Sequence, residues 1–186
     1  MSCVMSGGAS SEIVRVEAPG PKDGDFELKL QSKDGGSIVI LKSVGEQSKF
    51  ISNVAEEFEA GEENLVPLPN ITTETLEHVV DYLNFHRDDP AVKIERPLKK
   101  DLYEIISDWD REFLERFELQ GLFDIVLGAN YLDIKPLLRL GCAQIYSKYI
   151  RGQSPEKIRE TFGLPDDLTK EDQDRIREEN RWCEEA

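Results

Sequence analysis

Basic residues and cysteine are scarce in this sequence, and each scarcity excludes a class of function. Its 186 residues hold 23 Lys and Arg against 38 Asp and Glu, which gives a formal net charge of −15 with both histidines neutral. Nucleic acids and anionic membranes are bound through Lys and Arg, so we expect neither as a partner. The cysteines are only three, they lie far apart, and no C-x-x-C pair indicates a disulfide framework or a zinc site. A reducing compartment is therefore expected.

Long apolar runs and targeting signals are missing as well. No stretch of 18 apolar residues occurs, and the first residues, MSCVMSGGASS, lack the cationic and apolar regions of a secretory signal. Hydrophobic residues still make up 39% of the chain, which is enough for one core. We expect a soluble intracellular protein with one main domain and at most one appendage.

Motifs for catalysis and cofactors are also absent. The sequence contains no G-x-x-x-x-G-K-[ST], G-x-G-x-x-G, H-E-x-x-H or G-x-S-x-G pattern. His78 and His86 lie eight residues apart on one expected helix, which is too far for a single metal-binding pair, so both are interpreted as ordinary helix histidines. We therefore expect no enzyme, no catalytic residue, no cofactor and no metal site.

Three short strands are expected in the first 70 residues. Residues 26–30 alternate apolar and charged, residues 34–36 supply a turn, and residues 38–41 are aliphatic, which together predict a β-hairpin. The third strand, 65–68, contains Pro67, which cannot donate a ladder hydrogen bond, so this strand belongs at a sheet edge or is brief.

Apolar residues recur at helical spacing over most of the remaining chain, which makes the fold class α+β. Residues 121–132 are apolar around most of the helix circumference, so we expect this helix to be surrounded by protein. Cys142 is interpreted as a small buried hydrophobe.

Residues 1–25, rich in Gly, Pro and small polar residues, are interpreted as a flexible leader. Helices are expected over about 47–58, 72–87, 107–117, 121–132, 136–150, 155–162 and 170–182.

The tail from Ser154 has few apolar residues to fold upon. Ser154 and Thr169 can cap its two helices, but the last helix offers only Ile176, Trp182 and Cys183 as sizeable apolar groups. An isolated helix of this length is marginal in water, so the tail needs a surface of its own domain or of another chain. Apolar groups that lack partners at home commonly mark protein–protein sites, which favours a binding module over an enzyme.

Seven ordered blocks carry a resemblance to a known family. Together they resemble the S-phase-kinase-associated (Skp) adaptor family of cullin-RING ubiquitin ligases, over about residues 26–186. This resemblance implies a BTB/POZ fold, a three-stranded sheet packed with helices, over 26–150 and a C-terminal two-helix extension over 151–186. The blocks are FELKLQSKDGG (26–36), LVPLPNI (65–71), VVDYLNFHRDDP (79–90), WDREFL (109–114), LFDIVLGANYLDIKPLL (122–138), SPEKIRETF (154–162) and REENRWCEE (177–185).

The resemblance also implies a role, that of a non-catalytic adaptor in the cytoplasm and nucleus that bridges a cullin to F-box substrate receptors. It places Asn130 and Tyr131 on the cullin side. It places on the F-box side Phe123, Leu138 and Ile145 from the core helices, and Ile158, Phe162, Leu164, Trp182 and Cys183 from the tail. For Phe123 and Leu138, packing within the chain is as well supported as a place in the F-box interface.

Two further features bear on how far the family pattern applies to this sequence. Pro155 matches a proline that is hydroxylated and then glycosylated in some protist members, but we rank this below its role as the first residue of a helix. Between Cys142 and Gly152 the chain carries one residue more than the family pattern, which would rotate later positions of a regular helix by about 100°.

Two rival functions are weighed against the adaptor. A BTB/POZ structural or self-associating scaffold in another assembly would keep the fold and use the same apolar tail for a homodimer. An enzyme would need a catalytic constellation, which the sequence lacks. The sequence leaves open whether the free chain forms a homodimer.

Overall fold

The computed structural model describes residues 13–14, 20–58 and 64–181. The chain divides into two compact units between Ser147 and Lys148, close to the boundary expected at residue 150. No helix in the described ranges has the length and hydropathy needed to cross a bilayer.

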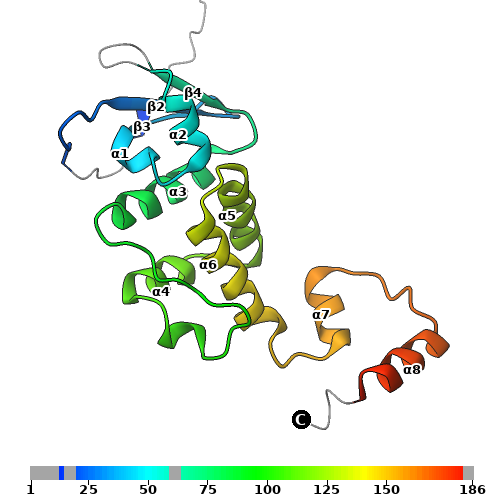
Figure 1. The fold of residues 1–186 in the computed structure, drawn as a ribbon. Coiled ribbons are helices and arrows are strands. Elements are labelled where there is room, and N and C mark those ends of the chain that lie inside the picture. Colours follow the sequence, from blue (N-terminus) through cyan, green and yellow to red (C-terminus); the bar gives the residue numbers. More distant parts are fainter. Residues whose placement is uncertain (1–12, 15–19, 59–63, 182–186) are drawn as a thin grey trace, which may run out of the picture. The chain divides into compact units, whose positions relative to one another are not determined.

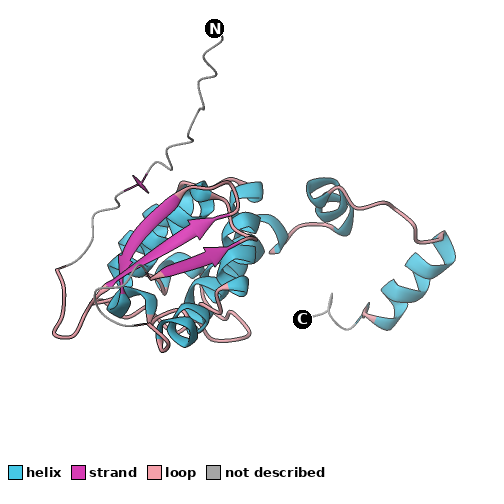
Figure 2. Cartoon of the chain, turned by 90° about the horizontal axis from the view of Figure 1, so that it is seen from above, coloured by secondary structure: helices cyan, strands magenta, loops and turns pink. Residues whose placement is uncertain are grey.

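A four-stranded sheet forms one layer of the first unit (Figures 1 and 2). Its strands are β1 (Ile13–Val14), β2 (Glu27–Ser32), β3 (Ser37–Leu41) and β4 (Leu65–Leu68), in the order β1-β3-β2-β4. β2 and β3 form the predicted antiparallel hairpin, while β1 and β4 run parallel to their neighbours at the two edges. Because Pro67 has no N–H to donate to a neighbouring strand, it can be part of β4 only at an edge of the sheet, as predicted.

Strand β1 is a fourth strand beside the three that the sequence predicts, and it lies within the segment 1–25. Ile13 and Val14 pair in parallel with Ser37 and Ile38 of β3. β-branched residues suit a strand, but a run of two is too short to show the alternation that predicts the other strands. At the end of the same segment, Asp25 accepts hydrogen bonds from the backbone N–H and the hydroxyl of Ser43.

Within the described residues of the first unit, seven helical elements precede the π-helical turn that follows α6. Ser48, Thr72 and Ser107 each accept a hydrogen bond from the backbone N–H three residues further on, and so cap the helices that begin after them. The elements are α1 (Lys42–Gly45), α2 (Lys49–Ala55), α3 (Thr73–His86), the 3₁₀ turn η1 (Leu102–Glu104), α4 (Asp108–Glu115), α5 (Leu119–Tyr131) and α6 (Lys135–Ile145).

The core lies between the sheet and the helices that cover one of its faces (Figures 1 and 2). Alternate residues of β2 and β3 point into it, and α3 packs against both strands. Each buried Leu or Ile contributes about 1.5–3 kcal/mol relative to an exposed one. The side chains of this layer that are at most 2% exposed include Leu28, Leu30, Ile38, Ile40, Leu76, Val79, Val80 and Leu83.

Helices α5 and α6 pack closely side by side, but they are less enclosed than their sequence suggests. A Cβ atom on Gly141 would lie 2.6 Å from Cγ2 of Val126, so glycine is what lets the two helices approach. The expectation that residues 121–132 are surrounded by protein is wrong, because Leu127 is 64% exposed. Cys142 is exposed and not buried as expected, since it lies on the outer side of α6.

The helix expected over 136–150 changes its geometry before it ends. The α-helical part stops at Ile145, and a π-helical turn, η2 (Tyr146–Ile150), continues it. A single π-helical turn inserts one residue into a helix without breaking it. A turn of this kind can accommodate the additional residue that is expected between Cys142 and Gly152.

The second unit consists of α7 (Pro155–Phe162) and α8 (Lys170–Glu179), as predicted. Gly163 ends α7 in the left-handed conformation, with φ at 63°, and the N–H of Leu164 then donates to the carbonyl of Arg159 over 2.9 Å. Over residues 148–176 and 178–181, no residue of this unit is buried.

Candidate protein-binding faces

The first candidate site is the α2–α5 face, defined by Phe50 on α2 and by Asn130 and Tyr131 at the end of α5. The rings of Phe50 and Tyr131 are in contact, with centroids 5.3 Å apart. Both side chains are half-buried, and Asn130 is exposed beside them. Partly exposed aromatic rings beside an exposed amide are typical of protein–protein interfaces, which are enriched in aromatic residues.

The start of α2 is locked to the end of α5 by one carbonyl. The hydroxyl of Ser48, which caps α2, donates to the carbonyl oxygen of Leu132 over 2.6 Å, and the N–H of Phe50 donates to the same oxygen over 3.4 Å. Carbonyls at a helix C-terminus have no partner in their own helix, so α2 satisfies this one. These hydrogen bonds therefore join the two halves of the face, which are far apart in the sequence.

The turn after α5 adds a hollow to this face. Asp133 adopts a positive φ of 50°, a conformation that aspartate tolerates better than most residues, and so starts the turn into α6. Lys49, Asp133, Lys135 and Pro136 line a hollow of about 290 Å³ there. A partner that contacts Tyr131 thus meets mixed charges and a concave surface next to the aromatic pair.

The residues predicted for a second face divide between the two units. Phe123 on α5 and Leu138 on α6 are half-buried, so part of each side chain remains available to a partner. Ile145 is only 8% exposed, because α6 turns it towards the core. All three lie on the α5–α6 pair, and their part in an interface stays a prediction.

The tail residues show more apolar surface. Ile158 and Phe162 on α7 are half-buried, and Leu164 is 54% exposed. Leu168 and Ile176 are also exposed, and Leu168 was not singled out by the sequence because it stands alone in a polar stretch. Trp182 and Cys183, two of the predicted interface residues, lie outside the described residues.

Pro155 begins α7 directly after its cap. Ser154 accepts a hydrogen bond from the N–H of Lys157 over 3.3 Å, and Pro155 is exposed in the first turn. The first helical residue needs no N–H, so this is the structural role expected of the proline. Its hydroxylation stays a prediction.

His86, the last residue of α3, joins α3 to α4. His86 Nε2 lies 3.0 Å from Oδ1 of Asp110, and its Nδ1 lies 2.7 Å from the carbonyl of Asp89, so both ring nitrogens are engaged. Burial opposes ionisation of Asp110, but hydrogen bonds from His86 and Ser107 outweigh it and hold the pKa of this carboxyl below its ordinary value. Within the described part of the chain, no group of three or more His, Cys, Asp or Glu could hold a metal ion.

Two family models match the chain. The Skp1 family tetramerisation domain matches residues 27–88, and the Skp1 family dimerisation domain matches residues 135–183. The S-phase kinase-associated protein 1 homolog of Tetrahymena thermophila is 39% identical over 164 residues, which cover 88% of this chain and 97% of the relative.

Fungal relatives are equally similar. The suppressor of kinetochore protein 1 of Schizosaccharomyces pombe is 39% identical over 161 residues, 85% of this chain and 98% of its own. The E3 ubiquitin ligase complex SCF subunit sconC of Talaromyces stipitatus is 39% identical over 158 residues, with 85% and 97% covered.

Proposed function

This chain belongs to the Skp1 family, and we propose that it is the adaptor subunit of an SCF E3 ubiquitin ligase, joining a cullin to F-box receptors. Its first unit has the BTB/POZ fold that the resemblance implies. The observation that carries the binding role is the tail, where no residue of 148–176 and 178–181 is buried and Leu164, Leu168 and Ile176 are exposed. A helix pair of this kind gains its stability from the surface it covers.

The cullin is assigned to the α2–α5 face. Asn130 and Tyr131 present an amide and an aromatic ring, and the ring is held in place by Phe50. The F-box is assigned to Phe123, Leu138 and the tail. Along α5, Phe123 and Asn130 are seven residues or about 10 Å apart, so the two partners would contact successive stretches of the same helix.

The adaptor acts by position alone. It holds a substrate receptor on the same scaffold as the ubiquitin-charged enzyme, which raises the effective concentration of the substrate lysine at the reactive thioester. No acid, base or nucleophile of this chain takes part in that step. We further propose that it works in the cytoplasm and the nucleus.

Affinity purification of the tagged full chain from its own cells, followed by mass spectrometry, tests this function. We expect one cullin and several different F-box proteins in the eluate. Recovery of F-box proteins without cullin would leave only a receptor-binding chain. Recovery of neither, or only of further copies of this chain, would contradict the adaptor and support a self-associating scaffold.

A further inference from the structure

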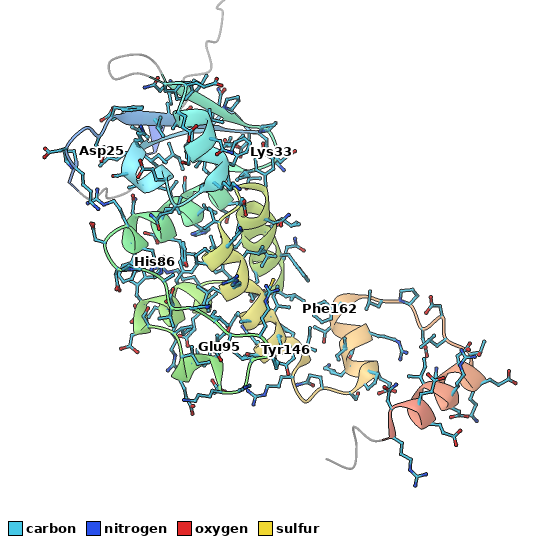
Figure 3. The ribbon with its side chains drawn as sticks, viewed as in Figure 1. Asp25, Lys33, His86, Glu95, Tyr146 and Phe162 are labelled. Carbon is cyan, nitrogen blue, oxygen red and sulfur yellow. The ribbon has the colours of Figure 1, made fainter. Side chains whose placement is uncertain are left out.

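A groove with an unusual charge runs between residues 93–100 and helix α6, and we name it the basic groove. At one end it is a pocket of about 430 Å³ lined by Lys93, Lys99, Arg96 and Arg139. At the other end it is a pocket of about 330 Å³ lined by Leu98, Ala143 and Tyr146. Ile94, Glu95, Arg96, Pro97 and Arg139 line both pockets, so the two pockets adjoin each other. Figure 3 shows Glu95 and Tyr146 close together by the lower end of α6.

Within the described residues, some cations form ion pairs and others, such as Lys33 and Lys135, do not, and the four cations of this groove belong to the second set. Arg87 pairs with Asp88 at 2.8 Å, and Arg116 pairs with Asp81 at 2.7 Å. By contrast, none of the four groove cations forms an ion pair with any residue in the described ranges. Glu95 is the one carboxylate that lines either pocket, so the groove has a local charge of +3 (four cations less one carboxylate) in a chain of net charge −15.

The wall of the groove is held at both of its ends. Before it, the carbonyl of Asp89 lies 2.7 Å from Nδ1 of the buried His86. After it, the hydroxyl of Tyr103 accepts a hydrogen bond from Nε2 of Gln144 on α6 over 2.9 Å. Between these ties Ile94 is only 7% exposed and anchors the segment. A groove shaped before binding loses less entropy when a ligand enters it.

The apolar end has room for one side chain. Tyr146, the first residue of the π-helical turn η2, is 42% exposed and forms part of its wall. Cys142 is exposed in the same pocket. A ligand that fills the whole groove must therefore combine negative charge with one apolar group, which is the chemistry of an acidic peptide segment that carries a Leu or an aromatic residue.

We propose that the basic groove binds an acidic segment of the F-box receptor, next to the F-box itself, with one apolar side chain in the end lined by Tyr146. This proposal rests on the proposed adaptor function. Arg139 directly follows Leu138 and therefore lies about 100° from it around α6, so the groove borders the side of α6 assigned to the F-box. A nucleic acid is disfavoured as the occupant because the net charge of −15 repels a polyanion that extends beyond the groove, whereas a short segment meets mainly the local charge.

A fluorescent peptide of glutamates with one central leucine tests the groove without any F-box or cullin. The full chain should bind it at low salt, and the counterpart with glutamine in place of glutamate should bind about fivefold less tightly or worse. The double variant Arg96→Glu with Lys99→Glu should lose about three- to tenfold in affinity. Lys33→Glu reverses the charge of an exposed lysine outside the groove and should leave the peptide affinity unchanged.

Alkylation of Cys142, followed by mass spectrometry, should slow in the presence of the glutamate peptide.

The same variants, tested on a captured F-box receptor, separate this proposal from the adaptor function. We expect the double variant to bind the receptor more weakly at low salt and like the wild type at high salt. Equal binding of the two peptides, or a double variant that binds both peptide and receptor normally, overturns the groove and leaves the adaptor intact. The proposal is also overturned if the double variant changes the sedimentation of the purified chain but not its binding of peptide or receptor, because the groove then contacts further copies of this chain. Failure of the wild-type chain to capture any receptor contradicts the adaptor function, whatever the peptide does.

Discussion

His86 and Asp110 are 24 residues apart in the sequence, yet they join α3 to α4 through a buried contact of 3.0 Å between Nε2 and Oδ1. Both side chains are 3% exposed. The stacked rings of Phe85 and Trp109, with centroids 4.1 Å apart, lie in the same junction. The junction also fixes the first residues of the loop that leads to the basic groove, through the carbonyl of Asp89.

Removal of the Asp110 carboxylate should destabilise the first unit. Asp110→Ala leaves a buried histidine without its partner and is expected to lower the free energy of unfolding by about 3 kcal/mol, measured by urea denaturation at pH 7. The matched control is Arg111→Ala, which breaks the exposed pair with Glu115 and should change stability by about 0.5 kcal/mol or less. Equal effects of the two variants would mean that the buried contact contributes little.

The same carboxylate should make stability depend on pH in the acid range. Its pKa in the folded protein lies below its ordinary value, so ionised Asp110 stabilises the fold above the unfolded pKa of about 3.9. That contribution is lost as the pH falls through the lowered pKa. We expect the stability difference between the wild type and Asp110→Asn to be constant at neutral pH and to shrink below about pH 4. A difference that grows on acidification would contradict the assignment.

The close approach of α5 and α6 at Gly141 predicts a change of sign in a double-mutant cycle. Gly141→Ala should destabilise by about 1 kcal/mol, because overpacking against Val126 exceeds the gain in helix propensity. In a Val126→Ala background the clash is gone, and the same change should stabilise by about 1 kcal/mol. Thermal unfolding of the four proteins measures this, and a stabilising Gly141→Ala in the wild type would show that the helices have room to spare.

The tail should gain order when an F-box binds. Backbone amides of residues 163–181 are expected to exchange hydrogen at least about tenfold more slowly in the complex, because α8 then packs on a partner. Amides of α3, in the core of the first unit, should exchange equally with and without the F-box. Unchanged exchange in the tail would contradict its role as a surface that a partner completes.

The sequence predicts elements whose signals are local. The hairpin of β2 and β3 follows from alternation around a Gly-rich turn, and the edge position of β4 follows from Pro67. Helix caps such as Ser107 can be predicted because the capping residue lies only three residues before the N–H from which it accepts a hydrogen bond. The π-helical turn η2 at the end of α6 has no such local signal, and the sequence predicts a continuous helix there.

Long-range features could not be predicted in the same way. The sequence places His86 on a helix but gives no reason to pair it with Asp110, since nothing in their spacing connects them. Leu127 and Cys142 are apolar, so they are assigned to the core, although the structure shows that no described element covers them. The basic groove escapes sequence analysis because Arg139 joins the other cations only after α6 packs beside them.

The central claim is that one chain binds a cullin and an F-box receptor through separate faces, and Tyr131→Lys tests it most directly. A lysine at this position places a charge in the contact with Phe50 and changes the α2–α5 face alone. In co-precipitation from cells, we predict that the variant loses the cullin and retains the F-box receptors. Circular dichroism should show an unchanged fold. Loss of both partners from a folded variant, or retention of both, would contradict the two-face adaptor.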